Sequence, residues 1–394
     1  MRRRPWLRKT QQFLLTGTVR NKYGSFLTSD EPGGWKNEND HSNCFSFSFL
    51  QGLRGAEIST ILGTGEAGFS GDGGLATEAK IRGPFGVVRG PDGCLYVCDT
   101  YNHCIRKIDA KGIVTTVAGK GGEKGYAGDG GLATKALSNE PYEVRFDRAG
   151  NMYFVEMMNH LIRRVDLKSG KISTIAGSGE KGFSGDGGLA KKARFNRPHS
   201  IQFGPEGNLF VCDIGNHRIR KIDMKTGMIS TFSGTGKKEK TRDCGKISEV
   251  NLNGPRAIDV VGNTMWLALR EGNAVYRLEL DKGTVHHVAG TGKKGFTGNG
   301  GPAKRATLSG PKGIAVGPKG NVYLADTESH SVRMIDLKTG KLELIAGDGK
   351  KGDGPEGKNP KKCRMDRLHG VFVDKDGAIY VGDTNTHRIR VVRP

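Results

Sequence analysis

The segment YVCDTYNHCIRKID, residues 96–109, decides the fold because five relatives of it follow along the same chain. From one copy to the next, the position of Asp99 advances by 57, 57, 56, 57 and 57 residues. A constant internal period of this size is typical of repeat architectures, in which each repeat is one supersecondary unit. The other copies are YFVEMMNHLIRRVD (153–166), FVCDIGNHRIRKID (210–223), WLALREGNAVYRLE (266–279), YLADTESHSVRMID (323–336) and YVGDTNTHRIRVVR (380–393). The sequence therefore predicts six repeats.

Each repeat contains four short apolar runs separated by turn residues. The first run follows a proline or its replacement, as in GPFGVV at 83–88, and a Gly-rich turn leads to a second run that begins with an aromatic residue. The Asp-x-x-Asn-His segment precedes the third run, and a fourth run such as ISTIAG (172–177) completes the unit. Such runs indicate an antiparallel four-stranded sheet. Because one sheet cannot bury both of its faces, we predict an all-β fold, a six-bladed β-propeller of four-stranded antiparallel blades.

The two ends of the repeat region are expected to form one blade together. The last repeat stops after its third run, whereas EISTILG at 57–63 precedes the first repeat and matches the fourth run of the other units. We predict that 57–63 pairs with 387–392, which completes the sixth blade and removes an open sheet edge. The predicted domains are 1–56, a basic and poorly ordered N-terminal tail, and 57–394, the propeller.

A second recurrent segment lies between the fourth run of one unit and the first run of the next. We interpret it as a repeated corner in which glycine supplies positive φ, aspartate holds backbone amides and the last residues make one helical turn. Two alternatives stay open: calcium bound by Asp72, Asp129 and Asp186, and an anion bound by clustered glycine amides. The copies are GFSGDGGLA (68–76 and 182–190), GYAGDGGLA (125–133), GFTGNGGPA (295–303) and a worn copy, TRDCGK (241–246).

Composition narrows the class of partner. The chain of 394 residues has 62 Lys or Arg and 41 Asp or Glu, a formal net charge of +21, and residues 1–56 hold only nine of these cations and four of the acids. The repeats therefore carry most of the positive charge, which attracts polyanions as well as favouring solubility. Of the seven cysteines, Cys98 and Cys212 occupy equivalent apolar positions and are expected in the core. No apolar run reaches the length of a membrane-spanning helix, so no membrane span is predicted.

The units resemble NHL repeats, a family named for the Asn-His-Leu triplet found here as Asn159, His160 and Leu161. A unit with a GDGG segment is similar in particular to bacterial NHL proteins and to the NHL region of teneurins. The resemblance covers 57–394 and implies a six-bladed propeller, and some members of the family bind RNA. The fourth unit departs from the pattern, because it lacks the Asp, Asn and His of the turn and carries TRDCGK in place of GDGG.

Two kinds of repeated polar residue are expected to be structural. One histidine and one arginine recur in five of the six units, so each set is spread around the ring and cannot converge on one ligand. The histidines should serve the turn, and the arginines should pair with its acids. The residues are His103, His160, His217, His330 and His387, and Arg106, Arg163, Arg220, Arg333 and Arg390.

The candidate site lies where the repeats differ. The residue that opens the innermost strand changes from unit to unit and mixes aromatic, imidazole and cationic side chains, which suits ligand binding at the channel mouth. Its members are Phe85, Tyr142, His199, Arg256, Lys312 and His369, with Glu143 one position deeper. No catalytic or metal-ligating set is expected here, since the two histidines lie opposite each other with only Glu143 as an obvious third ligand.

These features favour a non-enzymatic recognition or scaffold propeller that binds a protein or a small ligand on the face with the GDGG loops and the channel mouth. A first alternative is nucleic acid or another polyanion, because aromatic and cationic groups together suit base stacking and phosphate contact. A second is a metal-dependent lyase or lactonase-like enzyme, as six-bladed relatives include such enzymes. We expect a monomer without a cofactor, with calcium left open. The compartment is undecided, because the sequence as written shows no signal peptide whereas similar bacterial proteins are extracytoplasmic.

Overall fold

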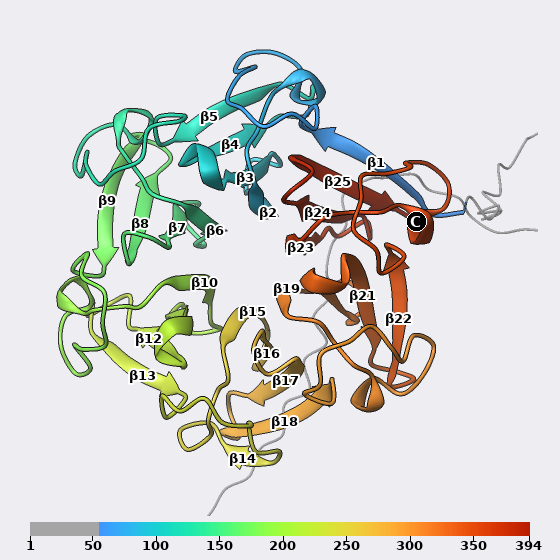
Figure 1. Cartoon of the computed structure of the whole chain (residues 1–394). Coiled ribbons are helices and arrows are strands. Elements are labelled where there is room, and N and C mark those ends of the chain that lie inside the picture. Colours follow the sequence, from blue (N-terminus) through green and yellow to red (C-terminus); the bar gives the residue numbers. More distant parts are fainter. Residues whose placement is uncertain (1–54) are drawn as a thin grey trace, which may run out of the picture. The chain divides into compact units, whose positions relative to one another are not determined.

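The ring architecture is plain in the computed structural model, which describes residues 55–394. Almost all of the predicted tail at 1–56 therefore lies outside the described residues. Regular structure in the described range consists of β-strands and three-residue 3₁₀ turns, and the strands form six antiparallel sheets around a common axis (Figure 1). The prediction of an all-β, six-bladed propeller is confirmed. Within that range no helix has the length and apolarity needed to cross a membrane.

Each blade begins with its innermost strand and meanders outward to the rim. Blade one is β2 (Pro84–Arg89), β3 (Leu95–Asp99), β4 (Cys104–Ile108) and β5 (Val114–Ala118), and blade two is β6 (Pro141–Phe146), β7 (Met152–Glu156), β8 (Leu161–Asp166) and β9 (Lys171–Ala176). Blade three is β10 (Pro198–Phe203), β11 (Leu209–Asp213), β12 (Arg218–Ile222) and β13 (Ile229–Ser233). Blade five is β19 (Pro311–Val316), β20 (Val322–Asp326), β21 (Ser331–Asp336) and β22 (Lys341–Ala346).

Blade six is assembled from both ends of the repeat region, as predicted. Strands β23 (Leu368–Val373), β24 (Ile379–Asp383) and β25 (Arg388–Arg393) supply three strands, and β1 (Glu57–Leu62) is the fourth. The register pairs Ile58 with Val392 and Thr60 with Arg390. Ile58 and Leu62 are fully buried, so the closing strand contributes to the core as well as to the hydrogen-bond ladder.

The core lies between adjacent blades. The aromatic residue that begins the second strand packs in a cluster with the following blade: Tyr96 meets Phe154, Tyr153 meets Ile201, and Tyr380 meets Val97. These rings are at most 6% exposed. Apolar contact between every pair of neighbours is what a sheet with two apolar faces requires, and these rings fill the space between neighbouring blades.

Blade four differs from the others at its outer edge. It contains β15 (Pro255–Val261), β16 (Thr264–Leu269), β17 (Ala274–Glu279) and β18 (Thr284–Ala289), and a two-residue strand, β14 (Gly245–Lys246), pairs with β18 as a fifth. Strand β14 lies within TRDCGK, the segment that replaces a GDGG loop, and at 247–249 an ordinary turn stands where the helical turn was predicted. The other five corners do form that turn, as η1 (Ala76–Glu78), η3 (Ala133–Lys135), η4 (Ala190–Lys192), η6 (Ala303–Arg305) and η8 (Pro360–Lys362).

Candidate functional site

The six residues predicted at the channel mouth meet at the axis. Each is the second residue of an innermost strand, and each is at most 8% exposed. In every blade the pairing of that strand with the next is interrupted just after its first residue, for example between Pro84 and Val87. A bulge at this point re-aims the side chain, and here it turns Phe85 and its equivalents toward the centre of the ring.

The rings of this set close the channel by packing on one another. Phe85 stacks on His369 with centroids 3.9 Å apart and an interplanar angle of 1°, and the edge of Tyr142 lies 4.7 Å from Phe85. His199 packs edge-on to Tyr142 at 4.4 Å. We call this layer of six side chains the floor. It closes the channel at the predicted mouth, because the aromatic faces are already occupied by neighbouring rings.

Arg256 is a buried cation without a carboxylate partner in the described part of the chain. Its guanidinium lies 4.7 Å over the ring of Tyr142 and donates a hydrogen bond to the Tyr142 hydroxyl. The Nε atom of Arg256 is buried and makes no hydrogen bond to any residue of the described range. Removal from water lowers the pKa of Arg256, but arginine keeps its proton. An unbalanced buried charge of this kind favours an anionic ligand.

His199 offers a free nitrogen beside Arg256. Its Nδ1 is 2.5 Å from the carbonyl oxygen of Arg197 and donates to it, so Nε2 carries the lone pair. That Nε2 is buried and has no hydrogen-bond partner among the residues that the structure describes. Burial, reinforced by the Arg256 charge, holds the pKa of His199 well below its usual range, so the ring is neutral. It can accept a hydrogen bond from a ligand hydroxyl.

Lys312 and His369 form the other half of the floor. The Lys312 ammonium is 3.3 Å from Nε2 of His369 and 3.3 Å from a carboxylate oxygen of Glu328. Burial, with Arg256 and Arg367 nearby, lowers the pKa of Lys312 to about 7. The Nδ1 atom of His369 lies 2.8 Å from the hydroxyl of Thr384. Both nitrogens of His369 are therefore engaged within the protein.

A hollow of about 820 Å³ lies above this floor. Its walls come from the turns between second and third strands and from the segments that precede the innermost strands. Seven Lys or Arg and two Glu line it. Four of the seven cations have no carboxylate within 4 Å in the described residues: Lys181, Arg197, Lys238 and Arg256.

Glu143 is the one predicted site residue that the structure separates from the hollow. It lies beneath the floor, in a cavity of about 20 Å³ that it shares with Arg145. Glu143 forms an ion pair with Arg145, and burial raises the pKa of Glu143 to about 7. Tyr142 and Glu143 both lie in the bulge between Pro141 and Val144, and Glu143 is one residue further along the strand, beneath the floor.

Several wall residues were missed from the sequence. Tyr101, Met157, Met158 and Ile214 follow the repeated acid of the turn, and Arg197 precedes an innermost strand. They differ between repeats, as the floor residues do. A comparison of the turn positions between repeats would therefore have identified them too. The sequence does not show that these turns lie close to the axis of the ring.

The arginines of the third strands form the centres of five buried clusters. Arg220 is 0% exposed and lies 2.6 Å from Asp186 of the GDGG loop and 3.6 Å from Asp213 of the turn. The ring of Phe183, from the same loop, covers the guanidinium at 4.9 Å. The predicted pairing with turn acids is confirmed in all five blades. The recurrent nonapeptide thus supplies an aromatic lid for a buried arginine in each of its four copies and an acid in three of them, with Asn299 in place of the acid in the fourth.

These clusters bear on the calcium alternative. The carboxylates of Asp72, Asp129 and Asp186 lie 2.8, 2.8 and 2.6 Å from a guanidinium nitrogen. Each has its charge balanced by arginine, which leaves calcium on these loops an untested prediction with no unpaired carboxylate among the three to favour it.

The repeated histidines connect successive blades. Nδ1 of His160 accepts a hydrogen bond from the backbone N–H of Arg197, 3.1 Å away in the next blade, and Nδ1 of His387 accepts one from Gly83 across the closure of the ring. His103, His217 and His330 do the same. Asn273 replaces the histidine in blade four, and its side-chain oxygen accepts from Gly310 at 2.9 Å. The predicted structural role is correct, although the contact lies between blades rather than within the turn.

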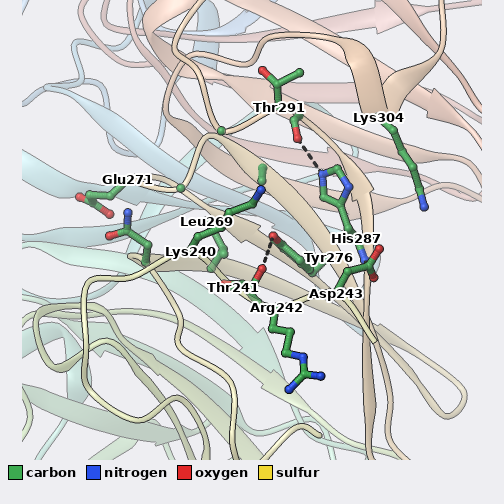
Figure 2. Close-up of a pocket in the computed structure, with 15 residues that line it drawn as sticks. Lys240, Thr241, Arg242, Asp243, Leu269, Glu271, Tyr276, His287, Thr291 and Lys304 are labelled. Atoms are coloured by element: carbon green, nitrogen blue, oxygen red, sulfur yellow. Dashed lines mark hydrogen bonds between the residues drawn. The ribbon is translucent and has the colours of Figure 1, made fainter. Parts of the chain in front are cut away.

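Blade four lacks the arginine cluster and has a second hollow in that region. Leu269 stands where the other turns have an acid, and Tyr276 stands where they have arginine. A space of about 800 Å³ borders both residues, and the Tyr276 hydroxyl donates to the carbonyl oxygen of Thr241 at 3.0 Å (Figure 2). The loss of one large charged side chain and its acidic partner leaves this space open.

Comparison with known proteins supports the repeat assignment. The family model described as NHL repeat matches residues 82–108, 195–222, 308–333 and 365–392. The repeats of blades two and four are outside these matches, and the repeat of blade four is the one with the altered turn. Each matched region runs from the residues before an innermost strand into the third strand of the same blade.

The chain aligns with parts of longer curated proteins. The chain is 31% identical to SUPPRESSOR OF QUENCHING 1 of Arabidopsis thaliana over 67% of its own length and 26% of that protein's. It is 27% identical to teneurin-1 of Gallus gallus over 85% of its length and 13% of that protein's. A solved auxiliary nutrient binding protein from Bacteroides thetaiotaomicron has the same fold, with a TM-score of 0.62 at 17% identity over 86% of this chain and 76% of that one. The matched repeats, these relatives and the six-bladed ring show that the chain carries NHL repeats arranged as a six-bladed propeller.

Proposed function

We propose that the protein is a recognition propeller that binds a small hydroxylated anion in the hollow at the channel mouth. One observation carries the proposal: Arg256 is buried at the base of an open hollow with no carboxylate partner in the described residues. The anionic group would lie on Arg256, and a ligand hydroxyl would donate to Nε2 of His199.

The size and charge of the hollow agree with this class of ligand. A volume of about 820 Å³ lies within the range of small-molecule sites, which is roughly 300–1,000 Å³. Lys181, Arg197 and Lys238 add unpaired positive charge around the rim, which attracts anions and raises their rate of arrival. The nutrient-binding description of a protein with the same fold is consistent with a small ligand, although the likeness concerns the fold alone.

The two alternatives from the sequence receive less support. Base stacking needs a free aromatic face, and the faces of Phe85 and His369 are turned to each other. A metal centre at the mouth needs free imidazole nitrogens, and those of His369 contact Lys312 and Thr384. Glu143, the third ligand considered, lies below the floor.

The test is a calorimetric screen with gluconate, citrate and glycerol phosphate as probes, together with their uncharged analogues. We expect the wild type to bind at least one anion, and Arg256→Met to weaken that binding about 30-fold or more, because one partner of a buried charged contact is lost. Arg148→Met removes an exposed cation elsewhere and should change nothing.

The screen also separates the alternatives. Equal binding by Arg256→Met and the wild type, or no binding of any probe, would overturn the proposal. A mixed RNA pool is the third arm. RNA binding that falls steeply with salt and is insensitive to Arg256→Met would favour the polyanion alternative instead.

A further inference from the structure

Three potential metal ligands meet at the outer edge of blade four. One ligand atom each from Asp243, Cys244 and His286 lie within 4.8 Å of one another. The Cys244 sulfur is 3.8 Å from Nδ1 of His286 and 3.8 Å from a carboxylate oxygen of Asp243. In the described part of the chain this is the only group of three such residues that converges in this way.

The extra strand of blade four creates this meeting. Strand β14 pairs with β18 through Gly245 opposite Val285, which places Cys244 beside His286. The Asp243 carboxylate is fixed by the backbone N–H of His287 at 2.8 Å. The ligands therefore come from a loop and a strand that the backbone ladder holds together, so little ordering is needed when an ion binds.

Comparison with the other repeats shows that three separate departures supply the three ligands. The position of Cys244 is glycine in the GDGG loops, and that of His286 is Thr115, Ser173 or Ser230 in the first three blades. The loop acid is bound by arginine in those blades, whereas Tyr276 replaces the arginine here and leaves Asp243 without a cationic partner within 4 Å among residues 55–394. None of the three changes is needed to make a blade, since the other blades form without them.

The second nitrogen of His286 already has the partners that metal-bound imidazoles have. Its Nε2 is 3.0 Å from the hydroxyl of Thr284 and 3.5 Å from a carboxylate oxygen of Glu279. A carboxylate on the far side of the ring fixes the tautomer, directs the Nδ1 lone pair toward the ion and increases its basicity. Glu279 therefore acts as a positioning residue, and Nδ1 is the nitrogen that faces Cys244.

We propose that Asp243, Cys244 and His286 bind a divalent transition metal of the zinc class, with solvent in the fourth position. Thiolate, imidazole and carboxylate together suit zinc, and three protein ligands with one open position are typical of an exchangeable site. Zinc–sulfur and zinc–nitrogen bonds of about 2.3 and 2.0 Å in a tetrahedron separate the two ligand atoms by about 3.5 Å. The observed 3.8 Å needs only a slight closure. Cys244 releases its thiol proton to solvent on binding.

The site is tested with cobalt(II) in the reduced, metal-free full chain. Wild type should develop the near-ultraviolet thiolate-to-cobalt band and the visible bands of tetrahedral cobalt, and zinc should abolish both. Cys244→Gly and His286→Ser restore residue types found at these positions in sister repeats, so both should fold. We expect no thiolate band for Cys244→Gly and at least tenfold weaker binding for His286→Ser. Cys94→Ser, which removes a partly exposed thiol elsewhere, should match the wild type.

The outcome that overturns the proposal is a thiolate band of equal strength in Cys244→Gly, or no band in the wild type at millimolar cobalt. Melting temperatures of the metal-free variants, recorded alongside, show whether each is folded. Because the probe and the variants are separate from those at the channel mouth, failure of this proposal leaves the proposed anion site unaffected, and the reverse also holds.

Discussion

Blades three and four share the same four antiparallel strands but carry different side chains at one interior position. In blade three, Arg220 is fully buried and joins an acid of the loop to an acid of the turn under an aromatic ring. In blade four, Tyr276 takes that place, the loop aromatic is absent and a hollow of about 800 Å³ remains. The blade closes in both cases, so the arginine cluster is not what makes the sheet.

The difference between the two blades shows where polar side chains of the loop are not engaged by a buried arginine. In five blades the arginine cluster fixes the loop, and the arginine engages the polar groups of that loop. Where it is lost, the loop acid and two new side chains, Cys244 and His286, come together instead. The hydrogen-bond ladder and the apolar faces maintain the blade in both settings, because they are independent of the identity of one interior side chain.

The largest expected effect comes from removing β1, the strand that completes blade six. Deleting residues 1–63 removes β1, exposes β25 along its whole edge and uncovers the core around Ile58 and Leu62, so we expect the ring to unfold. Deleting residues 1–55 leaves β1 in place and should leave the melting temperature unchanged. Circular dichroism of the two truncations decides the matter, and identical melting curves would show that blade six closes without β1.

The next effect tests the cluster itself. Arg220→Met leaves Asp186 and the buried Asp213 without their cation, so we expect a loss of about 3–5 kcal/mol in the free energy of unfolding. Burial already raises the pKa of Asp213 to about 6, and without Arg220 this carboxyl would take up a proton near neutral pH, which limits the loss. Tyr276→Phe in blade four removes one hydrogen bond and should cost only about 1 kcal/mol.

Urea unfolding of both variants measures these losses. Equal losses for Arg220→Met and Tyr276→Phe would mean that the cluster contributes no more than an ordinary hydrogen bond. The contrast between blades three and four would then be one of shape alone.

The smallest effect concerns the contacts between blades. Burial, aided by Arg82, lowers the pKa of His387 below its usual 6.5. Only the neutral ring can accept the hydrogen bond from the N–H of Gly83. The stabilisation is therefore present above about pH 6.5 and is lost as the pH falls through the lowered folded-state value. His387→Asn copies Asn273 of blade four, which accepts the equivalent bond without titrating.

The measurement compares the free energy of unfolding at about pH 7.5 and about pH 5.5 in both proteins. We expect the drop to be smaller in His387→Asn by about 0.5–1.5 kcal/mol, the contribution of one hydrogen bond. Buried acids such as Asp383 titrate equally in both proteins and cancel in the difference. An unchanged drop would show that His387 does not supply this acid sensitivity.

Much of the fold could be predicted because its determinants are local and repeated. The alternation of apolar runs with Gly-rich and Asn-His turns specifies four strands, and the period counts the blades. The fourth-run pattern at 57–63 also identified its partner strand correctly. The altered corner of blade four was recognised as an exception, but strand β14 within it was not predicted, since a two-residue strand exists only through pairing with β18.

The candidate site was predicted only in part. The second residue of each innermost strand was identified by its variability between units, and the structure brings those six side chains together. Glu143 was grouped with them, yet it lies one residue further along the bulged strand, below the floor. Within residues 55–394, the absence of a carboxylate partner for Arg256 and of a hydrogen-bond partner for Nε2 of His199 depends on packing across the axis, so no pattern along the chain could show it.

The sequence by itself determined that there are six blades, how each is built and which strand closes the ring, because period, alternation and turn chemistry act between residues close along the chain. Only the tertiary structure decided which side chains share a space. Arg256 and Tyr142 are two blades apart, and Cys244 and His286 are joined through the pairing of separate strands. Contacts of this kind are set by the curvature of the ring and the register of its sheets, which are properties of the assembled molecule.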